Sequence, residues 1–146
     1  MPKETHTIAE QNIEESFVLL KPDALERGLL GEILARLERK GLRLTRVKLL
    51  RVSHELARRH YAHLVDKPFF AELLAYITRG QALATTWRGR NAVSVIRQLV
   101  GATDPSAASP GSIRGDFALD QTENLIHASD SIESARKEIE NFFPEA

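Results

Sequence analysis

The sequence predicts an α+β fold in which helices cover a four-stranded antiparallel sheet. Four short apolar runs have the length and composition of strands, amphipathic helical segments separate them, and 146 residues is the size of one domain. We find no internal repeat, linker or low-complexity segment. We therefore expect one domain over residues 15–146, preceded by a polar, non-periodic and flexible extension over residues 1–14.

The composition excludes several classes of protein. Twenty Lys and Arg residues balance twenty Asp and Glu residues, so bulk charge does not favour nucleic acid or a membrane as the main partner. The chain has no cysteine, which excludes disulfides and thiol chemistry and fits a reducing compartment. No apolar run approaches the ~18 residues of a membrane-spanning helix, and residues 1–15 lack the apolar stretch of a secretory signal. We predict a soluble, cytoplasmic protein.

The first half of the chain is predicted to hold two strands joined by a helix. Phe17–Leu20 is a short apolar run stopped by Lys21-Pro22-Asp23, which is typical of a buried strand that ends in a turn. Residues 28–41 carry apolar side chains at helical spacing. Residues 42–52 alternate between apolar and polar side chains with a slip near Arg46, which indicates a strand with a local irregularity.

Two helices are predicted next. Ser53 is a suitable N-cap for a helix that runs to about Leu64. A second helix follows Pro68 and ends at Gly80, and its apolar side chains are Phe69, Phe70, Leu73, Leu74 and Ile77.

The second half begins with a third strand at 82–87 and a helix at 91–100. Residues 101–115 have no periodicity and include two prolines and three glycines. Long loops of this kind inside a compact domain are usually functional.

The stretch Asn124–Ser131 supplies the fourth strand and the start of the last helix. Asp130 and Glu133 have the spacing of a capping box, so the helix is predicted to begin there. Strand, helix, strand, two helices, strand, helix, strand and a last helix is the order of a split βαβ, or ferredoxin-like, sandwich.

His127 lies in this stretch and points outward from the apolar run. A histidine is largely neutral at pH 7 and offers a lone pair as a base or nucleophile, although a lone histidine is more often a buried structural residue. Lys21, Arg97 and Arg114 stand at the ends of predicted elements or beside the long loop, where Thr103 could add a hydrogen bond. Each cation alone is more often a solvated surface charge, but together they would suit a polyphosphate.

Other functional signals are absent or weak. The sequence has no G-x-x-x-x-G-K-[ST], G-x-G-x-x-G or D-F-G motif, which excludes a P-loop enzyme and a protein kinase. The G-x-x-G at residues 28–31 has an apolar middle and does not favour nucleic-acid clamping. Three histidines could suggest a zinc site: His54, His60 and His63. No nearby Cys or carboxylate completes such a site, and the intervals between the histidines suit a solvated helix face, so zinc is not favoured. Four further cations lie on the predicted second strand: Arg43, Arg46, Lys48 and Arg51. A solvated strand face explains them better than nucleic-acid binding does.

Seven motifs occur in one order along the chain. They are Lys21–Ala24, Arg27–Ile33, His60-Tyr61, Lys67–Phe70, Gly101–Pro105, Pro110–Phe117 and Asn124–Ser131. Together they closely resemble the nucleoside diphosphate kinase family over about residues 16–144. The P-G-S-I-R-G-D-F and N-x-x-H-x-S-D-S motifs are the most specific.

The resemblance implies a nucleoside diphosphate kinase. Such an enzyme transfers the γ-phosphate of a nucleoside triphosphate such as ATP to a nucleoside diphosphate by a ping-pong mechanism, and so maintains nucleoside triphosphate pools. His127 would be phosphorylated on Nδ1, Glu138 would orient the other ring nitrogen, and Ser129 would support that pair. Catalytic roles are also implied for Lys21 and Tyr61. The nucleotide-binding residues implied are Lys21, Phe69, Leu73, Arg97, Thr103, Arg114 and Asn124.

The resemblance also implies partners and a cofactor. Mg²⁺ would arrive with the nucleotide phosphates rather than in a protein cage. The partners would be nucleoside di- and triphosphates and further copies of this chain, in a tetramer or hexamer built from dimers, with neither membrane nor nucleic acid expected. The alternative is a non-catalytic binding protein of the same fold, and the presence of His127 with its cations favours the enzyme.

The chain departs from the family pattern at two positions in or near the implied site. Ala128 stands where many members have glycine directly after the histidine, and we expect alanine to be tolerated. Gln121 occupies a position near the base that is more often apolar.

Overall fold

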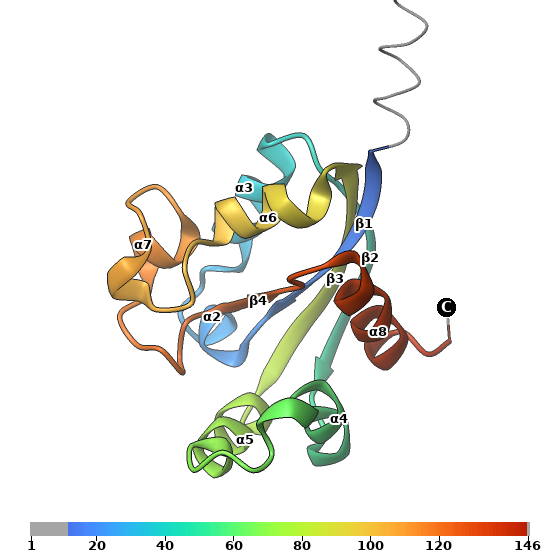
Figure 1. Ribbon diagram of the computed structural model, residues 1–146. Coiled ribbons are helices and arrows are strands. Elements are labelled where there is room, and N and C mark those ends of the chain that lie inside the picture. The colour runs from blue at the N-terminus through green and yellow to red at the C-terminus, as the bar shows by residue number, and fades with distance from the viewer. Residues whose placement is uncertain (1–11, 146) are drawn as a thin grey trace, which may run out of the picture.

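The computed structural model describes residues 12–145, which form one antiparallel sheet with helices on both faces (Figure 1). The sheet order is β2-β3-β1-β4 and every pairing is antiparallel. The strands are β1 (Ile13–Leu20), β2 (Arg43–Arg51), β3 (Gln81–Arg90) and β4 (Ile126–Ala128). Helix α3 (Leu30–Arg39) connects β1 to β2, and α6 (Ala92–Val100) lies between β3 and β4. The predicted ferredoxin-like sandwich is confirmed.

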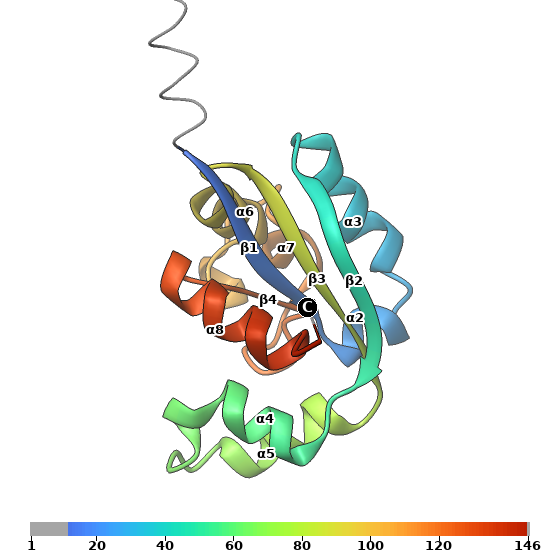
Figure 2. The same cartoon turned by 90° about the vertical axis from the view of Figure 1, so that its right-hand side faces the viewer.

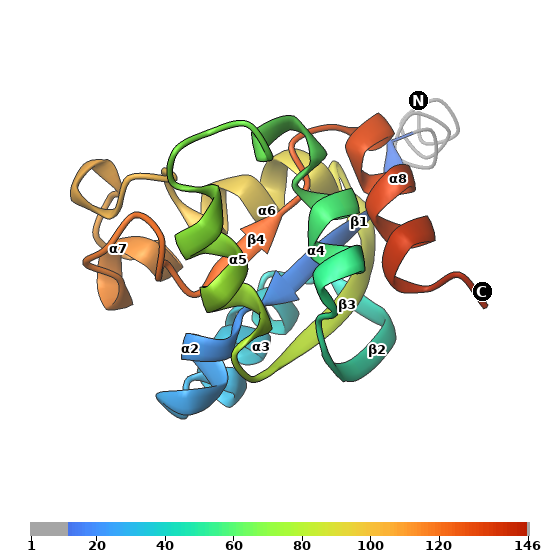
Figure 3. The same cartoon turned by 90° about the horizontal axis from the view of Figure 1, so that it is seen from below.

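Side chains alternate along β1 between two separate cores. Val18 and Leu20 pack under α3 and α6, whereas Phe17 and Leu19 pack under the opposite set of helices, and all four are fully buried. That set is α4 (His54–His60), α5 (Phe70–Thr78) and α8 (Ile132–Phe142). Figure 2 shows α8 crossing in front of the sheet and α4 and α5 together below it, and in Figure 3, seen from below, α4 and α5 lie in front of the sheet. The continuous apolar run of β1 thus reflects a central strand that is covered on both faces.

Two local predictions are confirmed. The irregularity predicted near Arg46 is a register shift between Leu44 and Arg46 in the β2–β3 pairing. The side chain of Ser53 accepts a hydrogen bond from the Leu56 amide, as expected for an N-cap.

Other elements differ from the prediction. The turn expected at Lys21-Pro22-Asp23 is a short helix, α2 (Pro22–Glu26), because proline at its start already has a helical φ. The loop predicted over 101–115 contains a 3₁₀ turn, η2 (Pro105–Ala107), and the start of α7 (Ile113–Phe117). The helix expected to reach Leu64 ends at His60, and a separate 3₁₀ turn, η1 (Ala62–Leu64), follows.

The ends of the predicted domain can be compared with the described residues. Strand β1 already includes Ile13 and Glu14, which belonged to the predicted extension. The rest of that extension, apart from Asn12, lies outside the described residues. Among the helices of residues 12–145, none is both long enough and apolar enough to cross a membrane.

The last helix begins one residue later than predicted. Its N-cap is Ser131, whose hydroxyl accepts a hydrogen bond from the Ser134 amide at 3.0 Å. Asp130, predicted as the cap, instead accepts a hydrogen bond from the Ser134 hydroxyl at 2.7 Å. The capping-box spacing of Asp130 and Glu133 was therefore misleading, because the adjacent serine occupies the cap.

This difference predicts the effect of two neighbouring substitutions on stability. Ser131→Ala should lower the free energy of unfolding by about 1 kcal/mol, because it removes the cap of α8. Asp130→Ala should cost less than half as much, since it removes only a hydrogen bond between exposed side chains. Urea denaturation of the two variants measures both values, and a larger loss for Asp130→Ala would contradict the assignment of the cap.

Candidate active site

One cavity of about 760 Å³ brings the predicted site residues together. Its walls come from the α4–α5 region, the long loop before β4, and helices α6 and α8. All but one of the predicted residues line it: Lys21, Tyr61, Phe69, Leu73, Arg97, Thr103, Arg114, Asn124, His127 and Glu138. The exception, Ser129, is fully buried and hydrogen-bonds to Glu138.

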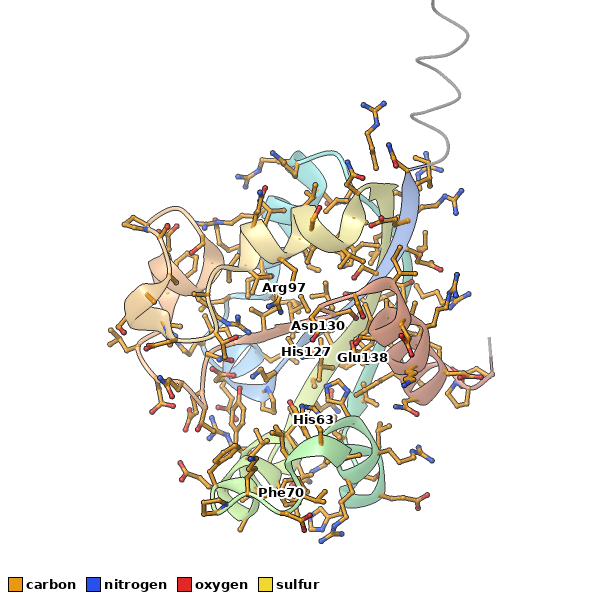
Figure 4. All side chains as sticks on the ribbon, viewed as in Figure 1. His63, Phe70, Arg97, His127, Asp130 and Glu138 are labelled. Carbon is orange, nitrogen blue, oxygen red and sulfur yellow. The ribbon has the colours of Figure 1, made fainter. Side chains whose placement is uncertain are left out.

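The position of His127 follows from the register of β4. His127 lies directly opposite Leu19 of β1, while its neighbours Ile126 and Ala128 belong to the core on the other face. Because directly opposed residues project to the same side of a sheet, His127 points toward α8 and α4. Figure 4 shows it near Glu138 and Arg97 in the middle of the molecule.

Glu138 determines which nitrogen of His127 is available. His127 Nε2 and Glu138 Oε1 are 3.0 Å apart, and Ser129 Oγ donates to the same carboxylate oxygen. A carboxylate only accepts hydrogen bonds, so Nε2 carries the proton and Nδ1 keeps its lone pair. The His127 side chain is 24% exposed, which leaves that lone pair open to a ligand in the cavity.

Lys21 is a buried cation of the cavity. Its ammonium donates to Asn124 Oδ1 at 2.6 Å, and its backbone amide donates to the Leu125 carbonyl. The pKa of Lys21 is lowered to about 7, mainly by burial and also by the charge of Arg114, while the charge of Asp23 acts in the opposite direction. Lys21 is therefore poised to gain a full charge when an anion enters.

Arg114 both supplies charge and braces the loop. Its guanidinium donates to three carbonyl groups, those of Gly101, Asn124 and Ile126. Burial and the nearby charge of Arg97 lower the pKa of Arg114 to about 10, so it remains charged at pH 7. Gly101 permits this geometry, because its φ is +91° and a Cβ there would lie 2.4 Å from the Ser112 hydroxyl.

The opposite wall of the cavity is apolar. Phe69 is 48% exposed, and Leu73 lies buried one helical turn further along. An exposed aromatic ring at a cavity wall offers a flat surface on which a planar ligand can stack. The Asn124 amide, also in the cavity lining, donates to the carbonyl groups of Thr103 and Gln121.

The strained residue before β4 was not predicted from the sequence. Leu125 has a φ of +76°, an uncommon conformation for a residue with a branched side chain. The Asp23 carboxylate accepts hydrogen bonds from the Leu125 amide and from the Tyr76 hydroxyl. Asp23 and Tyr76 therefore hold the turn that delivers Asn124 and His127, and only the K-P-D motif pointed toward Asp23.

The prediction for His60 was wrong. It was expected on a wet helix face, but it is 7% exposed and its ring centroid lies 4.5 Å from that of His127. The signal was present in the spacing, because His60 follows the buried Leu56 and Ala57 at intervals of four and three residues. His54 and His63 are exposed, as predicted.

Ala128 causes no backbone strain. Among residues 12–145, positive φ values at residues other than glycine occur only at Asn91 and Leu125. Ala128 pairs with Val18 as an ordinary strand residue, so glycine is not required there.

Comparisons with known proteins agree on one family. The sequence model of the family "nucleoside diphosphate kinase" matches residues 14–146. The nucleoside diphosphate kinase of Symbiobacterium thermophilum is 54% identical over 133 residues, which cover 91% of this chain and 89% of that protein. The nucleoside diphosphate kinase of Archaeoglobus fulgidus is 52% identical over 131 residues, 90% of this chain and 87% of that protein.

Solved structures give the same result. A halophilic nucleoside diphosphate kinase from Halobacterium salinarum, in complex with CDP, superposes with a TM-score of 0.87 at 48% identity and covers 89% of this chain and 87% of its own. The apo enzyme from Encephalitozoon cuniculi superposes with a TM-score of 0.88 at 43% identity, over 89% of this chain and 88% of its own.

The lowered pKa of Lys21 predicts a pH dependence of stability. Between about pH 7 and pH 10 the unfolded chain binds a proton at Lys21 that the folded chain does not, so the folded state gains stability as pH rises. From roughly pH 7.5 to 9, the unfolding free energy of the wild type should rise relative to Lys21→Met by about 1 kcal/mol per pH unit. Urea denaturation across this range measures the difference. Lys40→Met, at an exposed lysine, is the control. If the unfolding free energies of Lys21→Met and the wild type changed equally with pH, the prediction would be contradicted.

Proposed function

The chain belongs to the nucleoside diphosphate kinase family and is an enzyme of that kind, and we propose that it works by a ping-pong mechanism through a phosphohistidine at His127. The observation that carries this proposal is the pair formed by His127 Nε2 and Glu138, which leaves Nδ1 free beside a cationic cavity. A neutral imidazole with a fixed tautomer is a nucleophile that needs no further proton transfer.

In the first half-reaction, Nδ1 of His127 attacks the γ-phosphorus of a nucleoside triphosphate. An N–P bond forms, the bond to the oxygen that bridges the β- and γ-phosphorus atoms breaks, and a nucleoside diphosphate leaves with the electron pair. The imidazole becomes positively charged, and the Glu138 carboxylate at 3.0 Å stabilises it through Nε2–H. Ser129 holds that carboxylate in place.

The second half-reaction is the reverse with another nucleotide. A terminal β-phosphate oxygen of a nucleoside diphosphate attacks the phosphohistidine, the N–P bond breaks, and the electron pair returns to Nδ1. Lys21, Arg97 and Arg114 would neutralise the phosphate charges in both steps. Thr103 and Asn124 would bind phosphate or ribose oxygens, and Tyr61 would line the site.

The donor set of the cavity fits a magnesium ion that is carried by the nucleotide. The predicted phosphate end is built from cations rather than a cage of carboxylates, so the hard oxygen ligands would come from the phosphates. When bound, Mg²⁺ would neutralise charge on the β- and γ-phosphates. The protein residues then orient those phosphates against His127.

Phe69 and Leu73 would hold the base. Stacking on Phe69 uses the aromatic face that every base has, which supports a broad nucleoside range and a role in balancing nucleoside triphosphate pools. The exposed Gln121 lines the same cavity and makes the base pocket more polar than the family pattern.

Contacts within the chain argue against the nucleic-acid alternative. Lys48 donates to the Phe142 carbonyl and pairs with Glu145, and Arg51 donates to the carbonyl groups of Thr78 and Arg79. Two of the cations considered for nucleic-acid binding on β2 therefore have partners inside the protein.

The same strand supports the proposed oligomer. Strand β2 is an edge of the sheet, and its Val47 and Leu49 are 56% and 58% exposed. Open edges with apolar side chains are commonly covered by another chain, so a second copy at β2 would give the dimer from which a tetramer or hexamer is built. A cytoplasmic location remains part of the proposal and is supported by the absence of cysteine.

The mechanism predicts a covalent intermediate at one residue. Incubation with γ-labelled ATP and Mg²⁺, followed by an alkaline quench that preserves phosphohistidine, should label the wild type, and added GDP should remove the label as labelled GTP. His127→Ala should take up no label, because the nucleophile is gone. A labelled His127→Ala protein would overturn the assignment, and an unlabelled wild type would favour the non-catalytic alternative.

The cationic clamp predicts unequal effects of two arginine substitutions. Arg114→Ala should reduce kcat by roughly 100-fold or more, because it removes a buried charge at the phosphates and a brace of the loop. Arg88→Ala, at an exposed position on β3, should change kcat by less than about twofold. Steady-state assays of both variants, with circular dichroism to check folding, test the clamp. Equal losses would argue against it.

A further inference from the structure

Beside His127 and Glu138 lies His60, a donor that the proposed phosphoryl transfer does not use. His60, His127 and Glu138 each offer one ligand atom, and these atoms all lie within 4.8 Å of one another. We propose that these three residues bind one divalent transition-metal ion, such as Zn²⁺, when no nucleotide occupies the cavity. The bound ion would block phosphorylation of His127. The inhibitory part of this proposal rests on the proposed function, whereas the binding site does not.

His60 is the residue that points to a ligand. It is 7% exposed, and neither Nδ1 nor Nε2 has a hydrogen-bond partner among residues 12–145. Buried polar atoms are nearly always paired, and an unpaired one costs about 1–3 kcal/mol. The rings of Phe17, Tyr61 and Phe142 pack against the His60 ring, and none of them pairs with its nitrogen atoms. A metal ion would satisfy one of them.

The rings of His60 and His127 are arranged so that both can reach one ion. Their centroids are 4.5 Å apart and their planes are nearly perpendicular, at 83°. Glu138 adds an oxygen 3.0 Å from His127 Nε2. Zinc binds nitrogen at about 2.0–2.1 Å and carboxylate oxygen at about 2.0–2.2 Å, so only a small inward movement of these side chains is needed.

The donor types select the class of metal. Two imidazoles and one carboxylate suit zinc, copper, nickel or cobalt, whereas magnesium prefers oxygen ligands in an octahedron. A three-residue site also leaves a coordination position open toward the cavity. The proposed ion is thus chemically distinct from the magnesium that accompanies the nucleotide.

Metal binding and phosphorylation of His127 are mutually exclusive. If the ion takes Nδ1, it removes the lone pair that attacks phosphorus. If it takes Nε2, it displaces the hydrogen bond to Glu138 that stabilises the imidazolium. Either geometry blocks the first half-reaction, and release of the ion restores it.

Calorimetry tests the site without reference to activity. Titration of Zn²⁺ into the nucleotide-free protein should show one ion per chain, and His60→Asn should weaken that binding by roughly 10- to 100-fold. His54→Asn, at an exposed histidine of the same helix, is the matched control and should bind as the wild type does. Equal binding by the wild type and His60→Asn, or no binding by the wild type, would overturn the proposal.

Two measurements keep the test decisive if His60→Asn folds poorly. Co²⁺ added to the wild type should give the strong visible absorption of a four- or five-coordinate ion, and Glu138→Gln should weaken it. Absorption of the weak, hydrated type would overturn the site.

Labelling with γ-labelled ATP and Mg²⁺ then tests inhibition. Wild-type protein loaded with one equivalent of Zn²⁺ should label at least about tenfold more slowly than metal-free wild type. For His60→Asn, the labelling rates with and without Zn²⁺ should be nearly equal. Equal labelling of loaded and metal-free wild type would overturn the inhibitory role. Failure of metal-free wild type to label would instead contradict the proposed function, and calorimetry would still decide the metal site.

Discussion

The short pairing between β4 and β1 is the constraint on which the rest of the site depends. Only three residue pairs join these strands, yet they place His127 opposite Leu19 and fix the side of the sheet that it faces. The same pairing continues beyond the strand, where the Lys21 amide donates to the Leu125 carbonyl. Residues more than one hundred positions apart thereby meet at one end of the sheet, and the Lys21 ammonium reaches the Asn124 side chain. A slip of one residue would turn His127 into the opposite core, since strand side chains alternate in direction.

This arrangement requires interactions that a stable fold alone would not need. Leu125 adopts a positive φ, and Lys21 is buried where its charge is disfavoured. Arg114 is also buried, and its guanidinium donates hydrogen bonds to backbone carbonyl groups. Each of these conditions destabilises the empty protein, and each is offset locally, by Asp23 in the case of Leu125. Entry of a polyanion would relieve the electrostatic part of this cost. The site is therefore suited to a ligand whose negative charges pair with Lys21 and Arg114.

How much the sequence could predict depended on whether the signal was local. The strands, the helices and the irregularity at Arg46 could be predicted from local periodicity. The set of site residues, ten of which line the cavity, was predicted from a resemblance in several motifs at once. Three features escaped because they depend on what the fold brings together. The positive φ of Leu125 is stabilised by Asp23, which belongs to another element. The cap of α8 was decided between two adjacent residues with similar chemistry, and His60 carries a polar side chain on a buried helix face. For His60, residue type suggested exposure while spacing after Leu56 and Ala57 indicated burial, and the spacing was the better guide.

The two chemistries assigned to His127 have a common origin. A good nucleophile here must be a neutral imidazole with one lone pair free, held in position by a carboxylate on its other nitrogen. Those are also the conditions that metal-binding histidines meet, in which a second group fixes the tautomer and raises ligand basicity. The addition of His60, close enough for its ring to contact that of His127, supplies a further donor that the phosphoryl-transfer mechanism leaves idle. The proposed metal would therefore bind at the histidine end of the cavity, and the cations Lys21 and Arg114 favour a polyanion next to it. Because the metal would bind His127 and the nucleotide would phosphorylate it, the two would compete for this residue. A high nucleotide concentration would then protect the enzyme from the metal.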